Sequence, residues 1–212
     1  MRVEQSKKSR RRKSIHGGLE PLHYDYWKAA RDVYNSQDTV HDGFELIAKS
    51  GTAEAWKRDY DKDILVAFRG TKGSEDYASD LNIISGLNFR ANARYMRDKE
   101  FFKAVRLLYP PLDGWSYYVT GHSLGGAIAT AIVEDFPDVV HAREYNPAIF
   151  HDDVRNDALI DRIYNSRDPI YLYHKGRNFA TKVVTNNPKL VNYFTPYAAH
   201  SLEELEEFEK VQ

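Results

Sequence analysis

The stretch VTGHSLGGAIATAIV, residues 119–133, places Ser123 between Gly121 and Gly125. The residues before it, WSYYVT, are aromatic or β-branched, which predicts a strand. The residues after it are rich in alanine and apolar at helical spacing, which predicts a helix that ends before Pro137. Ser123 is therefore expected on a tight strand-to-helix turn, where the two glycines remove Cβ atoms that would collide.

Such a turn exposes a serine hydroxyl at the top of a sheet, beside the N-terminus of a helix, as in the nucleophile elbow of serine hydrolases. The alternative is a glycine-rich turn that binds phosphate at the helix N-terminus. The bare five-residue pattern does not separate the two. The flanking strand, the alanine-rich helix and the complete GHSLGG sequence favour the elbow.

At 212 residues the chain has the size of one domain with a sizeable core. It contains no cysteine, which excludes disulfides and thiolate metal sites. Its longest apolar run, AIATAIV, is far shorter than a membrane span, and no segment resembles a secretory signal. We therefore expect a cytoplasmic or otherwise intracellular protein, and no feature of the sequence calls for a cofactor or a metal.

The N-terminal tail, residues 1–20, is strongly basic. Its first thirteen residues hold seven of the 30 Lys and Arg and one of the 31 acidic residues, so the rest carries 23 basic and 30 acidic residues. This composition predicts a disordered extension, with contact to an anionic membrane as the functional alternative. No aromatic residue is interleaved with the basic ones, so nucleic acid binding is not favoured.

Residues 21–212 are predicted to form one folded domain in which strands and helices alternate, which favours an α/β fold with a mostly parallel sheet. Functional sites in such sheets lie beyond the carboxyl ends of the strands. Helices are predicted within 23–36, 95–109 and 201–210, and strands within 44–51, 53–60, 62–71, 139–150 and 159–170.

A serine nucleophile needs a histidine base, and the histidine needs a carboxylate, in the chain order serine, acid, histidine. Asp168 is the acid expected after the end of a predicted strand. Asp152, Asp153 and Asp157 lie in a polar stretch, and Asp161 lies at the opposite end of the strand. The alternative for Asp168 is a turn aspartate before proline.

Two histidines follow the acid. His174 is only six residues beyond it, in a predicted loop, whereas His200 precedes a helix for which Ser201 and Glu204 form a capping box. His200 is therefore the predicted base, with an ordinary surface or core histidine as the alternative. His122, beside the serine, is expected to pack or hydrogen-bond within the elbow.

An oxyanion requires two hydrogen-bond donors. The first is expected to be the backbone N–H of Leu124, directly after the nucleophile. The second is expected from the loop after the strand VAF, where the N–H and hydroxyl of Thr71 are candidates. The alternative for Thr71 is a turn that closes the strand.

Four separated motifs resemble, in order, those of the class 3, or fungal-lipase-like, serine esterases: FRGT followed by DL, then VTGHSLGGAIA, NSRDPI and AHSLEEL. The resemblance covers residues 40–205. It implies an α/β-hydrolase fold and hydrolysis of carboxylesters, on acylglycerols or phospholipids. It also implies Ser123, Asp168 and His200 as the triad and Thr71 as the oxyanion residue, with Asp80 bracing the oxyanion loop.

The resemblance also implies a lid at residues 81–95, although the apolar side chains there could equally pack into the core. Two other functions stay open from the sequence. One is hydrolysis of soluble short-chain esters or thioesters, and the other is an interaction module that keeps the fold without turnover. The sequence predicts no oligomeric state.

Overall fold

The computed structural model describes residues 21–35, 43–71, 89–149, 154–174, 176, 182–185 and 200–210. The basic tail lies outside these residues, so its disorder and its membrane contact stay predictions. Within the described residues, none of the helices combines the length and the apolar character that a membrane span requires.

The core of the fold is a seven-stranded sheet whose strands follow one another in chain order. The first three strands pair antiparallel, and each later strand pairs parallel with the one before it. The predicted mostly parallel sheet is confirmed, whereas the sequence analysis did not predict the last strand. The strands are β1 Glu45–Lys49, β2 Ala53–Arg58, β3 Asp63–Phe68, β4 Ser116–His122, β5 Val139–Tyr145, β6 Ile160–Asn165 and β7 Lys182–Thr185.

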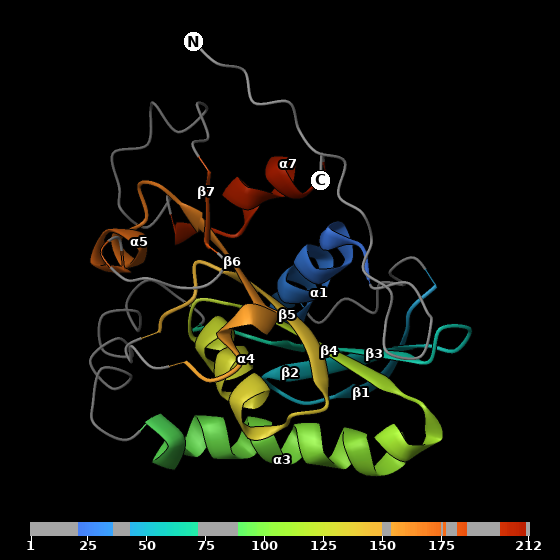
Figure 1. The fold of residues 1–212 in the computed structure, drawn as a ribbon. Helices are drawn as coiled ribbons and strands as arrows, with labels where there is room; N and C mark the ends of the chain where they lie inside the picture. Colours follow the sequence, from blue (N-terminus) through green and yellow to red (C-terminus); the bar gives the residue numbers. More distant parts are fainter. Residues whose placement is uncertain are drawn as a thin grey trace.

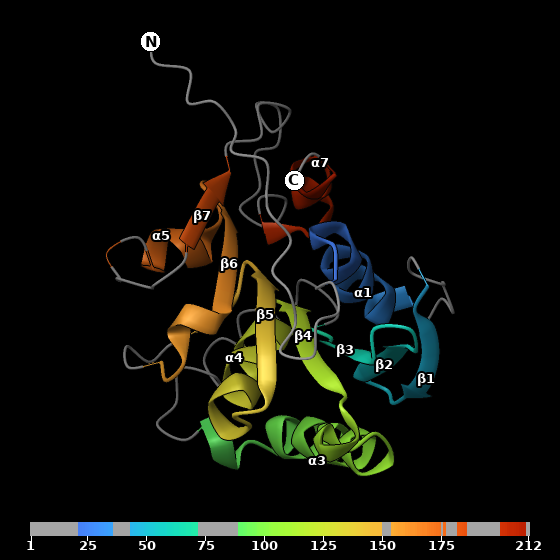
Figure 2. The same ribbon diagram turned by 45° about the vertical axis from the view of Figure 1, so that its right-hand side comes forward.

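Helices cover both faces of the sheet (Figure 1). Figure 2 shows α3 and α4 on one side of the central strands and α1 on the other, with α7 beside α1. This arrangement is the α/β-hydrolase class expected from the sequence. The helices are α1 His23–Asn35, α3 Ala93–Leu108, α4 Leu124–Asp135, α5 Pro169–His174 and α7 Glu206–Glu209, with short 3-10 turns at Phe89–Ala91, Pro111–Asp113, Asp157–Leu159 and Glu203–Leu205.

Strand β3 shows why the sheet needs both helical layers. Ile64, Val66 and Phe68 belong to the apolar cluster that includes residues of α3 and α4. Leu65 and Ala67, which point to the opposite face, belong to the cluster that includes residues of α1. All five side chains are fully buried. A continuous apolar run is therefore required here, as in other parallel sheets with both faces covered.

The chain reverses after β4 so closely that two positions exclude any side chain. Phe68 at the end of β3 pairs with Gly121 in β4. A Cβ at Gly125 would lie 2.0 Å from the Phe68 carbonyl oxygen, and one at Gly121 would lie 2.3 Å from the carbonyl carbon of Gly125. Both obstacles are backbone atoms and do not rotate away. The first turn of α4 can thus contact the ends of β3 and β4 only through glycine.

We predict that Gly125→Ala lowers the free energy of unfolding by about 1–3 kcal/mol or more, the cost of severe overpacking. The reason is that the added methyl must displace the end of β3. Thermal or urea denaturation would measure the loss.

Gly51→Ala is the matched control, because a Cβ at Gly51 meets no atom within 4 Å. It should leave stability unchanged or raise it by about 0.4–1 kcal/mol through the unfolded chain. Equal stability of the two variants would contradict this account of the elbow.

Candidate active site

Ser123 lies in a strained backbone conformation between β4 and α4. Its φ of 57° and ψ of −121° fall in a region that non-glycine residues rarely adopt. Its side chain is 4% exposed. The surrounding packing thus holds a serine at the carboxyl end of a central strand and at the N-terminus of a helix, as expected for an elbow.

Asp168 follows the end of β6 and directly precedes α5. Its N–H donates to the Asn165 carbonyl at 3.0 Å, which closes the turn. One carboxylate oxygen accepts the N–H of Ile170 at 2.6 Å, in the manner of a helix N-cap. Because Asp168 is fully buried, its second oxygen needs a partner inside the protein.

His200 is that partner. Its Nδ1 lies 2.6 Å from Oδ2 of Asp168. Since the carboxylate accepts, Nδ1 carries the proton, and Nε2 is the basic nitrogen of the neutral ring. Both residues are buried, so water does not compete for this hydrogen bond. The structure therefore brings together the predicted acid and the predicted base.

The segment that carries His200 is anchored on α1. The indole N–H of Trp27 donates to the Leu202 carbonyl at 3.0 Å. Leu202 and Leu205 pack into the apolar cluster on the α1 face. The predicted capping box with Glu204 is wrong in detail, because the Ser201 hydroxyl accepts the N–H of Glu203 at 3.3 Å and a 3-10 turn follows.

His122 directly precedes Ser123 and contacts His200. Its Nε2 lies 2.6 Å from the carbonyl oxygen of His200, and the two rings lie 4.7 Å apart. A carbonyl only accepts, so Nε2 carries the proton and Nδ1 accepts from the Tyr34 hydroxyl at 3.0 Å. Burial lowers the pKa of His122 to about 3, and electrostatic repulsion from the nearby His200 makes a smaller contribution. His122 was expected to pack or hydrogen-bond within the elbow, but its two hydrogen-bond partners, Tyr34 and His200, lie outside it, and the lowered pKa favours the neutral ring.

The loop after β3 lies beside Ser123 and Tyr34. Burial raises the pKa of Tyr34, and a hydrogen bond from the backbone of Gly70 opposes that rise. A Cβ at Gly70 would lie 3.2 Å from Cβ of Ser123, so this loop runs directly beside the serine. Thr71 follows Gly70, and Leu124 follows Ser123 at the start of α4. Of the two predicted oxyanion residues, Leu124 thus directly follows the serine, and Thr71 directly follows a residue that lies beside it.

Arg94 anchors the same loop from α3. Its guanidinium donates to the carbonyl of Arg69 and, through Nε, to Oδ2 of Asp98 at 2.6 Å. The other carboxylate oxygen of Asp98 accepts the Thr52 hydroxyl at 2.6 Å. Asp98 is fully buried, so this charge is stabilised by its ion pair and hydrogen bonds.

The structure places two of the other residues considered in the sequence analysis, His174 and Asp161. His174 ends α5 and does not lie on a loop as predicted. Asp161 is near the start of β6, 3.4 Å from Nε2 of His141, and so at the opposite end of the sheet from the serine. Asp80 lies outside the described residues. In the part of the chain that the structure describes, no cluster of side chains is suited to bind a metal ion.

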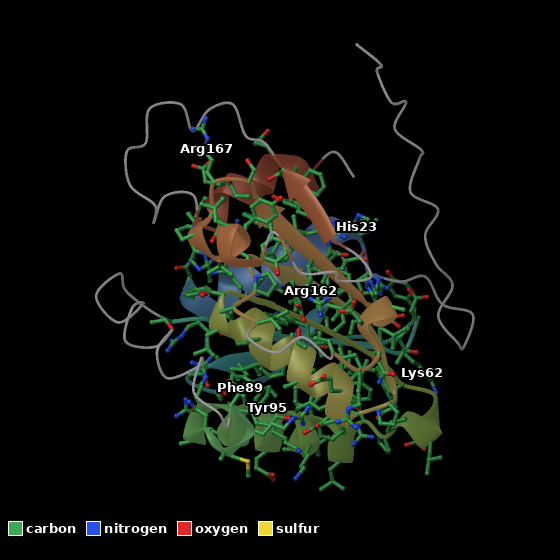
Figure 3. All side chains as sticks on the ribbon, turned by 60° about the vertical axis from the view of Figure 1, so that its left-hand side comes forward. His23, Lys62, Phe89, Tyr95, Arg162 and Arg167 are labelled. Carbon is green, nitrogen blue, oxygen red and sulfur yellow. The ribbon has the colours of Figure 1, made fainter. Side chains whose placement is uncertain are left out.

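The segment compared with a lid is described only from residue 89. Phe89 and Tyr95 lie together at the start of α3, with ring centroids 5.4 Å apart (Figure 3). Tyr95 belongs to the core cluster, and Phe89 packs against it. Of this segment, Phe89 and Tyr95 therefore pack as core side chains, and the lid prediction for 81–88 lies outside the described residues.

The sequence analysis missed Tyr34 and Arg94. Both lie on helices whose periodicity is visible in the sequence, but no local motif indicates that their polar ends contact His122 or the loop that follows β3. Tyr34 is 88 residues from His122, and Arg94 is 25 residues from Arg69. Only the docking of α1 and α3 on the sheet brings these pairs together.

We predict that His122 makes the fold sensitive to acid. The pKa falls from 6.5 to about 3 on folding, so the unfolded chain binds an extra proton between these pH values. Stability conferred by neutral His122 is then complete above pH 6.5 and is lost as the pH falls toward 3. The free energy of unfolding, measured by urea denaturation at several pH values in this range, should depend less on pH in His122→Gln. Its slope against pH should fall by up to about 1.4 kcal/mol per pH unit. Equal slopes in both proteins would contradict the prediction.

Comparison with known proteins supports the fold independently of the sequence motifs. No family model and no curated protein sequence matches the chain. A fungal lipase solved with an inhibitor is similar in structure at a TM-score of 0.59 and 17% identity, over 86% of this chain and 93% of that chain.

Two further lipases have the same architecture. The Penicillium expansum triacylglycerol lipase is similar at a TM-score of 0.56 and 18% identity, over 78% of this chain and 79% of that chain. The Lip2 lipase of Yarrowia lipolytica is similar at a TM-score of 0.53 and 17% identity, over 78% of each chain. The protein therefore has the α/β-hydrolase fold of the fungal lipases, which confirms the predicted resemblance at the level of the fold.

Proposed function

We propose that the protein is a serine carboxylester hydrolase that acts through an acyl-enzyme on lipid esters. The observation that carries the proposal is the buried hydrogen bond of 2.6 Å between His200 and Asp168, with His200 in contact with His122, the residue that precedes the strained Ser123. A histidine oriented by a carboxylate, next to an elbow serine, is the arrangement that activates a hydroxyl for attack on an ester.

In this mechanism the Ser123 oxygen attacks the ester carbonyl while Nε2 of His200 takes the hydroxyl proton. The carboxylate of Asp168 keeps the imidazole in the correct tautomer and stabilises the imidazolium. The imidazolium then gives its proton to the leaving alcohol, and the acyl group stays on the serine. Water, deprotonated by the same nitrogen, hydrolyses the acyl-enzyme.

The negative oxygen of the intermediate is assigned to the backbone N–H of Leu124 and to Thr71. Acylglycerols or phospholipids are the proposed substrates, because the solved proteins with this fold include a triacylglycerol lipase and a fungal lipase discussed for interfacial activation. Soluble short-chain esters or thioesters are the alternative substrates.

A fluorophosphonate probe tests the nucleophile, because it reacts with serines activated by a base. We predict that the protein is labelled at Ser123 and that Ser123→Ala abolishes both labelling and ester hydrolysis, a loss of about 10⁶ in kcat. Asp168→Asn should lower kcat by about 10⁴ through the wrong imidazole tautomer. A wild-type protein that folds but takes up no probe would instead indicate an interaction module without turnover.

A series of nitrophenyl esters of rising acyl length tests the substrate class. For a lipid esterase we expect kcat/KM to rise with chain length, because each buried methylene contributes about 0.8 kcal/mol. Ser123→Ala gives the background rate for every ester. A maximum at acetate or butyrate, or faster turnover of a matched thioester, would identify a hydrolase of small soluble substrates.

A further inference from the structure

The turn after β5, residues 145–148, is hydrogen-bonded to the backbone of Ser123. The Ser123 N–H donates to the Tyr145 carbonyl at 3.0 Å, and the Ala148 N–H donates to the Ser123 carbonyl at 3.0 Å. Pro147 packs so closely on α4 that a Cβ at Gly126 would lie 2.7 Å from its Cβ. The strained serine is therefore fastened on both sides to residues 145–148.

Asn146 lies at the centre of this turn and is fully buried. Its φ of 43° is left-handed, a conformation that asparagine tolerates better than most residues. Its N–H donates to the Ile163 carbonyl of β6 at 2.8 Å. The backbone of Asn146 thus joins the end of β5 to the strand that leads to the acid.

The side chain of Asn146 makes two further hydrogen bonds. Its Oδ1 accepts the N–H of Asn165 at 2.9 Å, and the carbonyl of Asn165 accepts the N–H of Asp168. Its Nδ2 donates to the carbonyl oxygen of His200 at 3.3 Å. One amide therefore contacts both the turn that carries the acid and the residue that carries the base.

We propose that Asn146 is a positioning residue that sets the geometry between Ser123 and the Asp168–His200 pair. The carbonyl of His200 accepts from Nδ2 of Asn146 and also from Nε2 of His122. Two donors from different elements fix the plane of this peptide and hence the direction of the imidazole. The inference rests on the proposed function and deepens it, because Asn146 contacts the turn of the acid and the backbone of His200 and lies in the turn that is hydrogen-bonded to Ser123.

Asn146→Gly is the informative variant. Glycine adopts a left-handed φ without strain, so the turn keeps its backbone path while both side-chain hydrogen bonds are lost. We expect kcat for a nitrophenyl ester to fall by between about tenfold and 10²-fold with KM nearly unchanged, the cost of a catalytic group misplaced by a fraction of an ångström to an ångström. Loss of folding alone would lower the active fraction and not the kcat of the active protein determined by probe titration.

Asn156→Gly is the matched control. Asn156 also has a left-handed φ, of 60°, and its Nδ2 donates to the Val133 carbonyl at 3.4 Å. It precedes the 3-10 turn Asp157–Leu159 at the opposite end of β6, so a left-handed asparagine and one of its side-chain hydrogen bonds are removed away from the serine. This variant should keep the wild-type kcat and KM.

Asn146→Asp provides a second test if the glycine variant does not fold. The carboxyl group has the same shape and keeps an oxygen toward the Asn165 N–H, but when ionised it replaces the donor to the His200 carbonyl with an acceptor, so the variant is assayed at alkaline pH. We expect a loss of kcat at least as large as in Asn146→Gly. Wild-type kcat in a folded Asn146 variant would overturn the proposal.

Proton NMR gives a readout that does not require turnover. A proton shared between an imidazole Nδ1 and a carboxylate resonates far downfield, and its absence in His200→Gln would assign it. Asn146→Gly should broaden or remove this resonance, and Asn156→Gly should retain it. The two proposals can fail separately. If the wild-type protein neither hydrolyses esters nor takes up the probe, the proposed function is refuted. The positioning role still holds if Asn146→Gly loses the resonance and Asn156→Gly retains it. An unchanged resonance in Asn146→Gly would overturn the positioning role.

Discussion

The contact between the first turn of α4 and the end of β3 is the constraint on which the site depends. At Gly125 the two backbones approach so closely that a Cβ would lie 2.0 Å from the Phe68 carbonyl oxygen. This approach forces the chain to reverse within a few residues after β4, and Ser123 takes the strained conformation as a result. It also places the loop that begins at Arg69 beside the serine, because that loop continues from the same strand end. A wider spacing between α4 and the sheet would relieve the backbone strain at Ser123 and would also move the loop at Arg69 away from the serine.

The loops around the serine are anchored mainly through their carbonyl groups. Arg94 binds the carbonyl of Arg69, whereas His122 and Asn146 bind that of His200. Each donor is itself hydrogen-bonded or ion-paired within the protein, which limits the cost of burying polar groups so close to the sheet. A loop anchored by its carbonyl leaves its side chain available for chemistry. Preorganisation of this kind is what transition-state stabilisation requires, since groups already in place need not reorganise during reaction.

The sequence predicted the fold class and the candidate triad because both depend on local patterns. The strand, glycine turn and alanine-rich helix around Ser123 form one continuous signal, and Asp168 and His200 each lie at a recognisable element boundary. The short strand β7 and helix α5 escaped prediction, since neither is long enough to show a period. The contacts of Tyr34, Arg94 and Asn146 could not be predicted either. They depend on which face of a helix, or which side of a turn, meets a residue distant in the sequence.

Two neighbouring histidines divide the roles at this site, and the division follows from their hydrogen bonds. His200 has a carboxylate at Nδ1, which fixes the orientation of its ring. His122 has a carbonyl at one nitrogen and the Tyr34 hydroxyl at the other, and burial lowers its pKa to about 3. With ring centroids 4.7 Å apart, two imidazolium ions would repel each other strongly in a buried site. A neutral His122 is therefore compatible with the proposed role of His200 as the base, and the hydroxyl of Tyr34 favours that neutral state by donating to Nδ1.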